Sequence, residues 1–162
     1  MQKIYNPFIL NERPDYNCFG CSPKNELGLQ LEFRDTGEEL VTSWEPKEWL
    51  VGYNNILHGG IQATLLDETA AWVVLTKCKT AGVTTEINVK YLKPVLITKG
   101  KIEVRSALDR IEESIAVIRG SLFDGEGVCC ATAEIKYFCY PEAVARRKLH
   151  YPGVAAFYHE SL

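Results

Sequence analysis

A glycine pair and a carboxylate eight residues further on are the groups in this sequence best suited to chemistry. Residues 54–77 read as a loop that reaches His58, Gly59 and Gly60 and continues into an apolar run containing Asp67. The first N–H groups of a helix lack intrahelical partners and carry the positive end of its dipole. Because glycine lets a ligand approach that backbone closely, the pattern predicts a site that polarises a carbonyl or binds an oxyanion.

The distance between Gly59 and Asp67 constrains how they could act together. At about 1.5 Å of rise per residue, eight residues of helix separate them by roughly 12 Å, which an aspartate side chain cannot span. If both act on one carbonyl, they must come from two chains related by a two-fold axis, with antiparallel helices. We therefore expect a homodimer with two equivalent sites.

The elements that position these residues follow from hydrophobic periodicity. Residues 61–75 are apolar around most of a helix, so most sides of that helix need cover. Alternating or apolar runs bounded by turn residues predict about six strands, at 27–33, 40–44, 83–92, 100–108, 114–123 and 128–140, with a short helix at 142–149. Consecutive hairpins make the sheet antiparallel. The expected fold class is α+β, a curved antiparallel sheet wrapped around one long central helix.

Composition narrows the classes of function. The chain has 162 residues, 46% hydrophobic and 24% charged, which is ordinary for one globular domain. We expect a core at about 18–140, an N-terminal arm at 1–17 and a C-terminal helix and tail at 141–162. The net charge of −3 gives no indication of the basic surface that binds nucleic acid. Without a signal-peptide core or a long apolar run, no membrane association and a cytoplasmic location are expected.

The six cysteines require separate treatment. Cys18 and Cys21 have the C-x-x-C spacing of metal ligands, but no second pair follows at zinc-ribbon spacing. A structural turn is therefore favoured over a metal site, and no metal or other cofactor is expected. The remaining cysteines fit buried free thiols.

Three motifs resemble those of the hotdog-fold thioesterase superfamily, in particular those of its phenylacetyl-CoA thioesterase (PaaI-like) branch. They are the sequence LHGG at 57–60 with ATLLDE at 63–68, GVT at 82–84, and NVKYLKP at 88–94. The sequence CFGC at 18–21, with Gly28 and Leu29, is similar to an opening common in that branch. The resemblance covers roughly residues 18–140.

The resemblance implies hydrolysis of acyl-CoA thioesters by a homodimer or a dimer of dimers. The Gly59 N–H would polarise the thioester carbonyl, and Asp67 of the partner subunit would act as general base or nucleophile, two roles that remain open. Thr84 falls where relatives place a serine or threonine that helps to position water. The further candidates, for substrate binding, are His58, Gly60, Asn54, Asn55, Glu68 and Lys90.

One position departs from the family pattern. Many relatives carry Asn, Gln or His six residues before the motif histidine, where this chain has Gly52, and Asn54 or Asn55 could substitute. His58 is expected to orient the helix start, and Glu68 to pair with a loop or a subunit neighbour. The departure at Gly52 leaves an alternative function, a non-hydrolytic protein that binds acyl-CoA or regulates through it.

Overall fold

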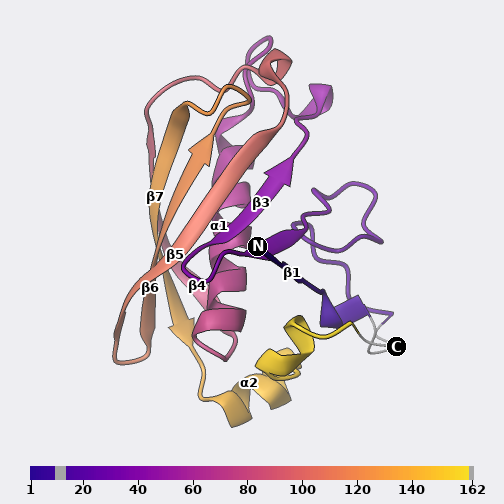
Figure 1. Cartoon of the computed structure of the whole chain (residues 1–162), viewed down its shortest axis with the longest axis vertical. Helices are drawn as coiled ribbons and strands as arrows, with labels where there is room; N and C mark the ends of the chain where they lie inside the picture. The colour runs from indigo at the N-terminus through magenta and orange to yellow at the C-terminus, as the bar shows by residue number, and fades with distance from the viewer. Residues whose placement is uncertain (10–13, 161–162) are drawn as a thin grey trace.

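A curved antiparallel sheet wraps around one long helix in the computed structural model of this protein, which describes residues 1–9 and 14–160 (Figure 1). The described part has seven strands in the order β1-β2-β3-β5-β6-β7-β4. Their bounds are β1 Gln2–Ile4, β2 Phe33–Asp35, β3 Leu40–Trp44, β4 Gly82–Tyr91, β5 Ile102–Glu112, β6 Ile115–Phe123 and β7 Cys129–Cys139. The helices are α1 Gly59–Lys77 and α2 Glu142–Leu149. This is the hotdog architecture, so the predicted fold class is confirmed.

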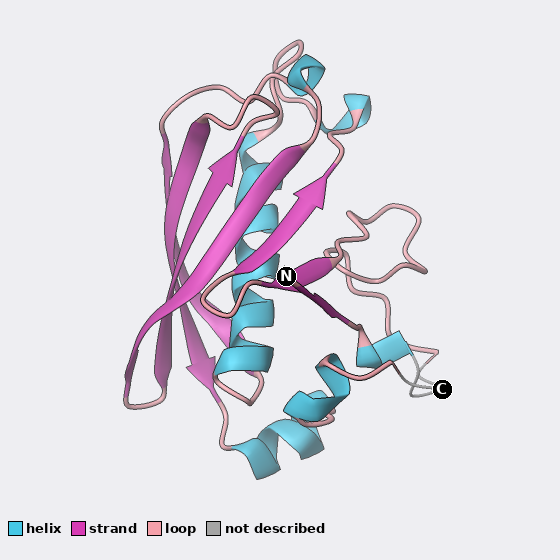
Figure 2. Cartoon of the chain, in the orientation of Figure 1, coloured by secondary structure: helices cyan, strands magenta, loops and turns pink. Residues whose placement is uncertain are grey.

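Helix α1 runs along the length of the sheet and is buried on the side that faces it (Figure 2). The buried side includes polar residues such as Thr69 and Thr76. Their hydroxyls donate hydrogen bonds to backbone carbonyls one turn earlier in the helix. A second stripe is only half-buried and consists mainly of small side chains: Ala63, Thr64, Asp67 and Ala71. The sheet of one chain therefore covers only part of the helix, although its sequence is apolar nearly all round.

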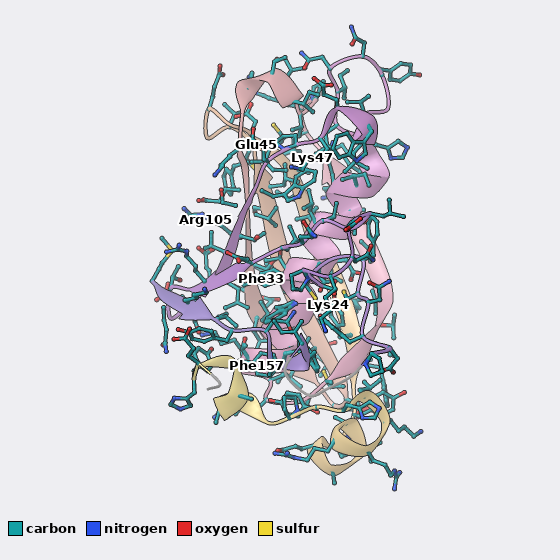
Figure 3. The ribbon with its side chains drawn as sticks, turned by 90° about the vertical axis from the view of Figure 1, so that its right-hand side faces the viewer. Lys24, Phe33, Glu45, Lys47, Arg105 and Phe157 are labelled. Carbon is teal, nitrogen blue, oxygen red and sulfur yellow. The ribbon has the colours of Figure 1, made fainter. Side chains whose placement is uncertain are left out.

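Aromatic side chains join α1 to strand β2 and to the C-terminal segment. Trp72 is buried and stacks on Phe33 of β2, with ring centroids 4.5 Å apart. Phe157 meets the other side of Trp72 edge-on at 5.6 Å. The Tyr151 hydroxyl donates to the Leu75 carbonyl at 2.9 Å. In Figure 3, Phe33 and Phe157 lie in the same half of the molecule, where the C-terminal segment covers the end of α1.

The predicted strand at 27–33 is wrong as regular structure, because β2 begins only at Phe33. Gln30 has φ of 52°, a left-handed conformation that breaks an extended backbone. Leu29 and Leu31 are nevertheless buried, as the alternation predicted. Their N–H groups donate to the loop that precedes them rather than to a neighbouring strand of the sheet.

The connection predicted at 109–113 is also shorter than expected. Strand β5 continues through Glu112, and a tight turn at Glu113, with φ of 54°, leads into β6. A bulge after Leu108 takes up the irregular register. The charged residues that suggested a loop lie on the exposed end of this hairpin, where Arg110 pairs with Asp109 and Glu112 at 2.6 Å each.

The segments outside the expected core of 18–140 also contact it. Strand β1 pairs with β2 at one edge of the sheet. Parts of the predicted arm and tail, at 10–13 and 161–162, lie outside the described residues. No helix in the described part has both the length and the hydropathy needed to span a membrane.

Candidate active site

The start of α1 is capped by a histidine and followed by an open backbone donor. His58 has φ of −56° and ψ of 134°, outside the helical region, and its Nδ1 accepts from the Gly60 N–H at 2.9 Å. The His58 carbonyl accepts from the N–H groups of Ile61 and Gln62. Gly59 is the first helical residue, and no backbone acceptor among the described residues pairs with its N–H. This leaves the Gly59 N–H available to a ligand.

A shallow pocket of about 350 Å³ opens beside this donor, lined in part by Leu57, Gly59, Gln62, Tyr91 and Pro94. The Tyr91 hydroxyl donates to the Gly59 carbonyl at 2.7 Å, which fixes the first peptide of the helix against the end of β4. Gln62 is only 3% exposed, and its Nε2 donates to the Leu57 carbonyl. Its Oε1 has no partner among the described residues. A buried acceptor without a partner in a pocket is a feature that a ligand donor would satisfy.

The Asp67 carboxylate is held by hydroxyl groups from two strands. Thr84 of β4 donates to Oδ1 at 3.0 Å, and Tyr137 of β7 donates to the same oxygen at 2.5 Å. Burial, followed by the charge of Asp67, raises the pKa of Tyr137, so that this phenol keeps its proton and acts as a donor. No described residue binds Oδ2. The carboxylate is thus anchored through one oxygen and free to react through the other.

Gly59 and Asp67 of one chain lie near opposite ends of β4. Gly59 contacts Tyr91, the last residue of the strand, whereas Asp67 contacts Thr84 near its beginning. The helix rise separates them by roughly 12 Å. One chain therefore holds the two halves of a site apart.

The structure places the other candidates in several different environments. Asn55 is engaged by Thr98, since its Nδ2 donates to Oγ1 at 3.0 Å and its Oδ1 accepts from the Thr98 N–H at 3.1 Å. Asn54 is exposed. Gly52 lies beside the His58 ring, where a Cβ would come within 3.5 Å of it. The departure from the family pattern thus falls next to the helix start.

Glu68 and Lys90 point to other surfaces. The Glu68 carboxylate faces the N-terminal loop, where Cys18 Sγ lies 3.5 Å from its Oε1. Lys90 lines a depression of about 370 Å³ over β4, β6 and β7, and the lining includes neither Gly59 nor Asp67. These two residues are not brought together with the residues of the helix start.

Sequence reasoning missed Tyr137 and Gln62 as parts of this site. Tyr137 lies 70 residues from Asp67 and reads only as one more aromatic position of a strand. Gln62 offered a signal, because it lies three residues after Gly59, on the same helix face, and is polar within an apolar run.

Comparison with known proteins relates this chain to thioesterases in sequence and in fold. A sequence model of the thioesterase superfamily matches residues 54–131, the segment that includes α1 and β4. An uncharacterised protein of Schizosaccharomyces pombe is 37% identical over 62 residues, which are 38% of this chain and 35% of that protein. The chain therefore spans about a third of the length of that relative.

Two solved structures share the fold. A thioesterase of Haemophilus influenzae has a TM-score of 0.62 at 19% identity, over 69% of this chain and 79% of that chain. A Streptococcus mutans protein solved bound to acetyl CoA has a TM-score of 0.65 at 16% identity, over 82% of this chain and 98% of that chain. The TM-scores show a common fold, and at identities this low the similarity extends to the fold alone.

Proposed function

We propose that this protein, whose residues 54–131 match a sequence model of the thioesterase superfamily, hydrolyses acyl-CoA thioesters to the free acid and CoA. The observation that carries the proposal is the Asp67 carboxylate, anchored through Oδ1 and free at Oδ2. The unpaired N–H of Gly59 supplies the hydrogen-bond donor that would polarise the thioester carbonyl. The acetyl CoA bound by the similar Streptococcus mutans protein supports a CoA-type substrate.

In this mechanism the Gly59 N–H donates to the thioester oxygen and stabilises the negative charge that develops on it. Acting as general base, Asp67 Oδ2 takes a proton from water while the water oxygen attacks the carbonyl carbon. The carbon–sulfur bond then breaks, and the CoA thiolate receives the proton. Acting instead as nucleophile, Asp67 Oδ2 attacks the carbonyl carbon, and the carbon–sulfur bond breaks as the CoA thiolate leaves and takes up a proton from solvent. Water then cleaves the resulting anhydride, which releases the free acid and restores the Asp67 carboxylate.

The two groups meet if β4 pairs with its copy across a two-fold axis. Strand β4 is at the edge of the sheet and leaves one row of backbone groups unpaired. An antiparallel β4 pair centred between Ile87 and Asn88 would set Thr84 opposite the partner subunit's Tyr91. Because Thr84 contacts Asp67 and Tyr91 contacts Gly59, each dimer would then contain two complete sites.

The surface beside this edge supports the same homodimer. Large hydrophobic side chains along β4 and just after it are exposed, with Ile87 at 41%, Tyr91 at 52% and Leu92 at 54%. The half-buried stripe of α1 lies on the neighbouring element and consists mainly of small residues. A second copy would cover both surfaces, and four copies arranged as a dimer of dimers would contain the same pair.

A thiol-release assay over acyl-CoAs of several lengths, including aromatic acyl groups of the kind taken by the PaaI-like branch, tests the function. Asp67→Asn keeps the shape and the acceptor Oδ1 but removes the basic oxygen, so we expect kcat to fall about 10³-fold. Asp109→Asn, at a half-buried carboxylate of β5 that lies outside this site, is the matched control and keeps wild-type turnover. Binding of acyl-CoA without turnover would instead support the non-hydrolytic alternative. Turnover that survives Asp67→Asn would refute the site.

A further inference from the structure

The N-terminal loop and α1 bring together three side chains that ligate metals. Cys18 and Cys21 come from the loop, and Glu68 comes from the middle of the helix. Their ligand atoms all lie within 4.8 Å of one another, and Cys18 Sγ is 3.5 Å from Glu68 Oε1. Cys21 is buried, whereas Cys18 and Glu68 are half-buried, so an ion could enter from solvent. The third donor, which C-x-x-C spacing alone does not reveal, comes from 50 residues away.

The loop is shaped for close approach to the carboxylate. The N–H groups of Leu29 and Leu31 donate to carbonyls of the loop at 2.8 and 2.9 Å, which holds the turn in place. Between the two cysteines stands Gly20, where a Cβ would come within 2.4 Å of Glu68 Cδ. Any other residue at this position would push the turn and the carboxylate apart. Figure 3 looks onto the side of the molecule that carries this loop, whose continuation is marked by Lys24.

Hydrogen bonds from neighbouring side chains orient the three metal-ligating groups, as such hydrogen bonds do in known metal centres. The Trp72 Nε1–H donates to Glu68 Oε1 at 3.1 Å. The Tyr16 hydroxyl lies 3.0 Å from Cys21 Sγ and accepts from Asn6 Nδ2 at 3.1 Å. Because the Asn6 amide donates to a lone pair of the Tyr16 oxygen, the hydrogen of the Tyr16 hydroxyl can point at the Cys21 sulfur.

The Glu68 carboxylate has no cationic partner in the part of the chain that the structure describes. Its contacts there are the Cys18 thiol at 3.5 Å and the Trp72 indole N–H at 3.1 Å. Neither of these groups carries a positive charge. A divalent cation bound between the two sulfurs and this carboxylate would supply it.

We propose that Cys18, Cys21 and Glu68 bind one Zn²⁺, with water at the fourth position. In a tetrahedral zinc site with a Zn–S distance of about 2.3 Å and a Zn–O distance of about 2.0 Å, sulfur and oxygen lie about 3.5 Å apart. Cys18 Sγ and Glu68 Oε1 are separated by this distance. Two thiolates with one carboxylate suit zinc better than calcium or magnesium, which prefer oxygen alone. The ion would fasten the N-terminal loop to α1, one residue beyond Asp67.

Metal content and cobalt spectroscopy of the full chain test this site. Purified under reducing conditions and loaded with Zn²⁺, the wild type should retain one equivalent after gel filtration. Cys18→Ser should lose stoichiometric zinc, with affinity down at least about 100-fold, and Glu68→Gln should lose about tenfold while keeping the acceptor for Trp72. The matched control is Cys129→Ser, whose thiol lies in β7 and donates to the Ala131 carbonyl at 3.7 Å; this substitution should leave zinc binding unchanged.

Two further readouts connect metal binding to these donors. Substitution by Co²⁺ should give a thiolate-to-cobalt charge-transfer band that Cys21→Ser weakens. Saturating Zn²⁺ should raise Tm by about 5 °C in the wild type and by nothing in Cys18→Ser. Absence of stoichiometric zinc from a wild type with all thiols reduced would overturn the proposal. So would a Cys18–Cys21 disulfide that persists under reducing conditions, or equal zinc binding by Cys18→Ser and the control.

Discussion

Replacing Gly59 by proline removes a single N–H from the proposed site and nothing else of substance. Proline is favoured at the first position of a helix, where its fixed φ suits the backbone and its missing donor has no intrahelical partner. The residue before it, His58, already has the extended ψ of 134° that precedes proline without a clash. A Cβ at Gly59 would meet the Tyr91 ring at 3.5 Å, an ordinary contact. Gly59→Ala adds the same carbon and keeps the N–H, so it is the matched control.

The magnitude follows from the role of a backbone donor that faces an oxyanion. Removing one such donor costs about 10²–10³ in kcat, or about 3–4 kcal/mol of transition-state stabilisation. We therefore expect Gly59→Pro to lower kcat by that factor in the thiol-release assay, with Tm close to that of the wild type. Gly59→Ala should stay within about threefold of the wild type. Equal activity of the two variants would refute the assignment of the Gly59 N–H.

The same variant tests whether each site is shared between two subunits. Chains carrying Gly59→Pro and chains carrying Asp67→Asn are co-expressed with different tags, and the mixed dimer is purified on both. One of its two sites then combines an intact Gly59 with the intact Asp67 of the partner, so activity should return to about half that of the wild type. If both residues acted within one chain, neither subunit of the mixed dimer would be competent. Activity no higher than in the parent variants would then exclude the shared site.

Two further predictions concern side-chain contacts that form only in the folded chain, those of Tyr137 and of Asp35. Tyr137→Phe removes a donor to Asp67 Oδ1, so the carboxylate loses part of its anchor; kcat should fall about tenfold with KM nearly unchanged in steady-state assays. Burial raises the pKa of Asp35, but hydrogen bonds from Lys77 and other donors outweigh it, so the pKa lies below its ordinary value. Its contribution to stability is present above the unfolded pKa of about 3.9 and is lost as pH falls through the folded value. Asp35→Asn should lower the free energy of unfolding by about 2 kcal/mol at pH 7 in denaturant titrations and flatten its dependence on pH below about 4. An unchanged acid dependence in this variant would contradict the assignment.

Local patterns carried the prediction of the main elements, because they depend on contacts between near neighbours. The apolar run after Gly60 predicted the central helix to within two residues at each end. The alternation of Leu27, Leu29, Leu31 and Phe33 correctly predicted burial of the last three side chains, but Leu27 is 86% exposed and the backbone between them was not predicted. The left-handed φ of Gln30 depends on the loop that pairs with this segment, and residue type alone does not reveal it.

By itself, the sequence determined that Gly59 opens a helix and that Asp67 lies two turns further along it, since the helix rise depends only on residue number. It therefore also determined that one chain cannot bring the two together. The tertiary structure decided which strands meet the helix: Tyr137 reaches Asp67 across 70 residues, and Cys18 reaches Glu68 across 50. These contacts depend on sheet register and on the path of a loop. Periodicity specifies which face of an element is buried, but not which distant element covers it.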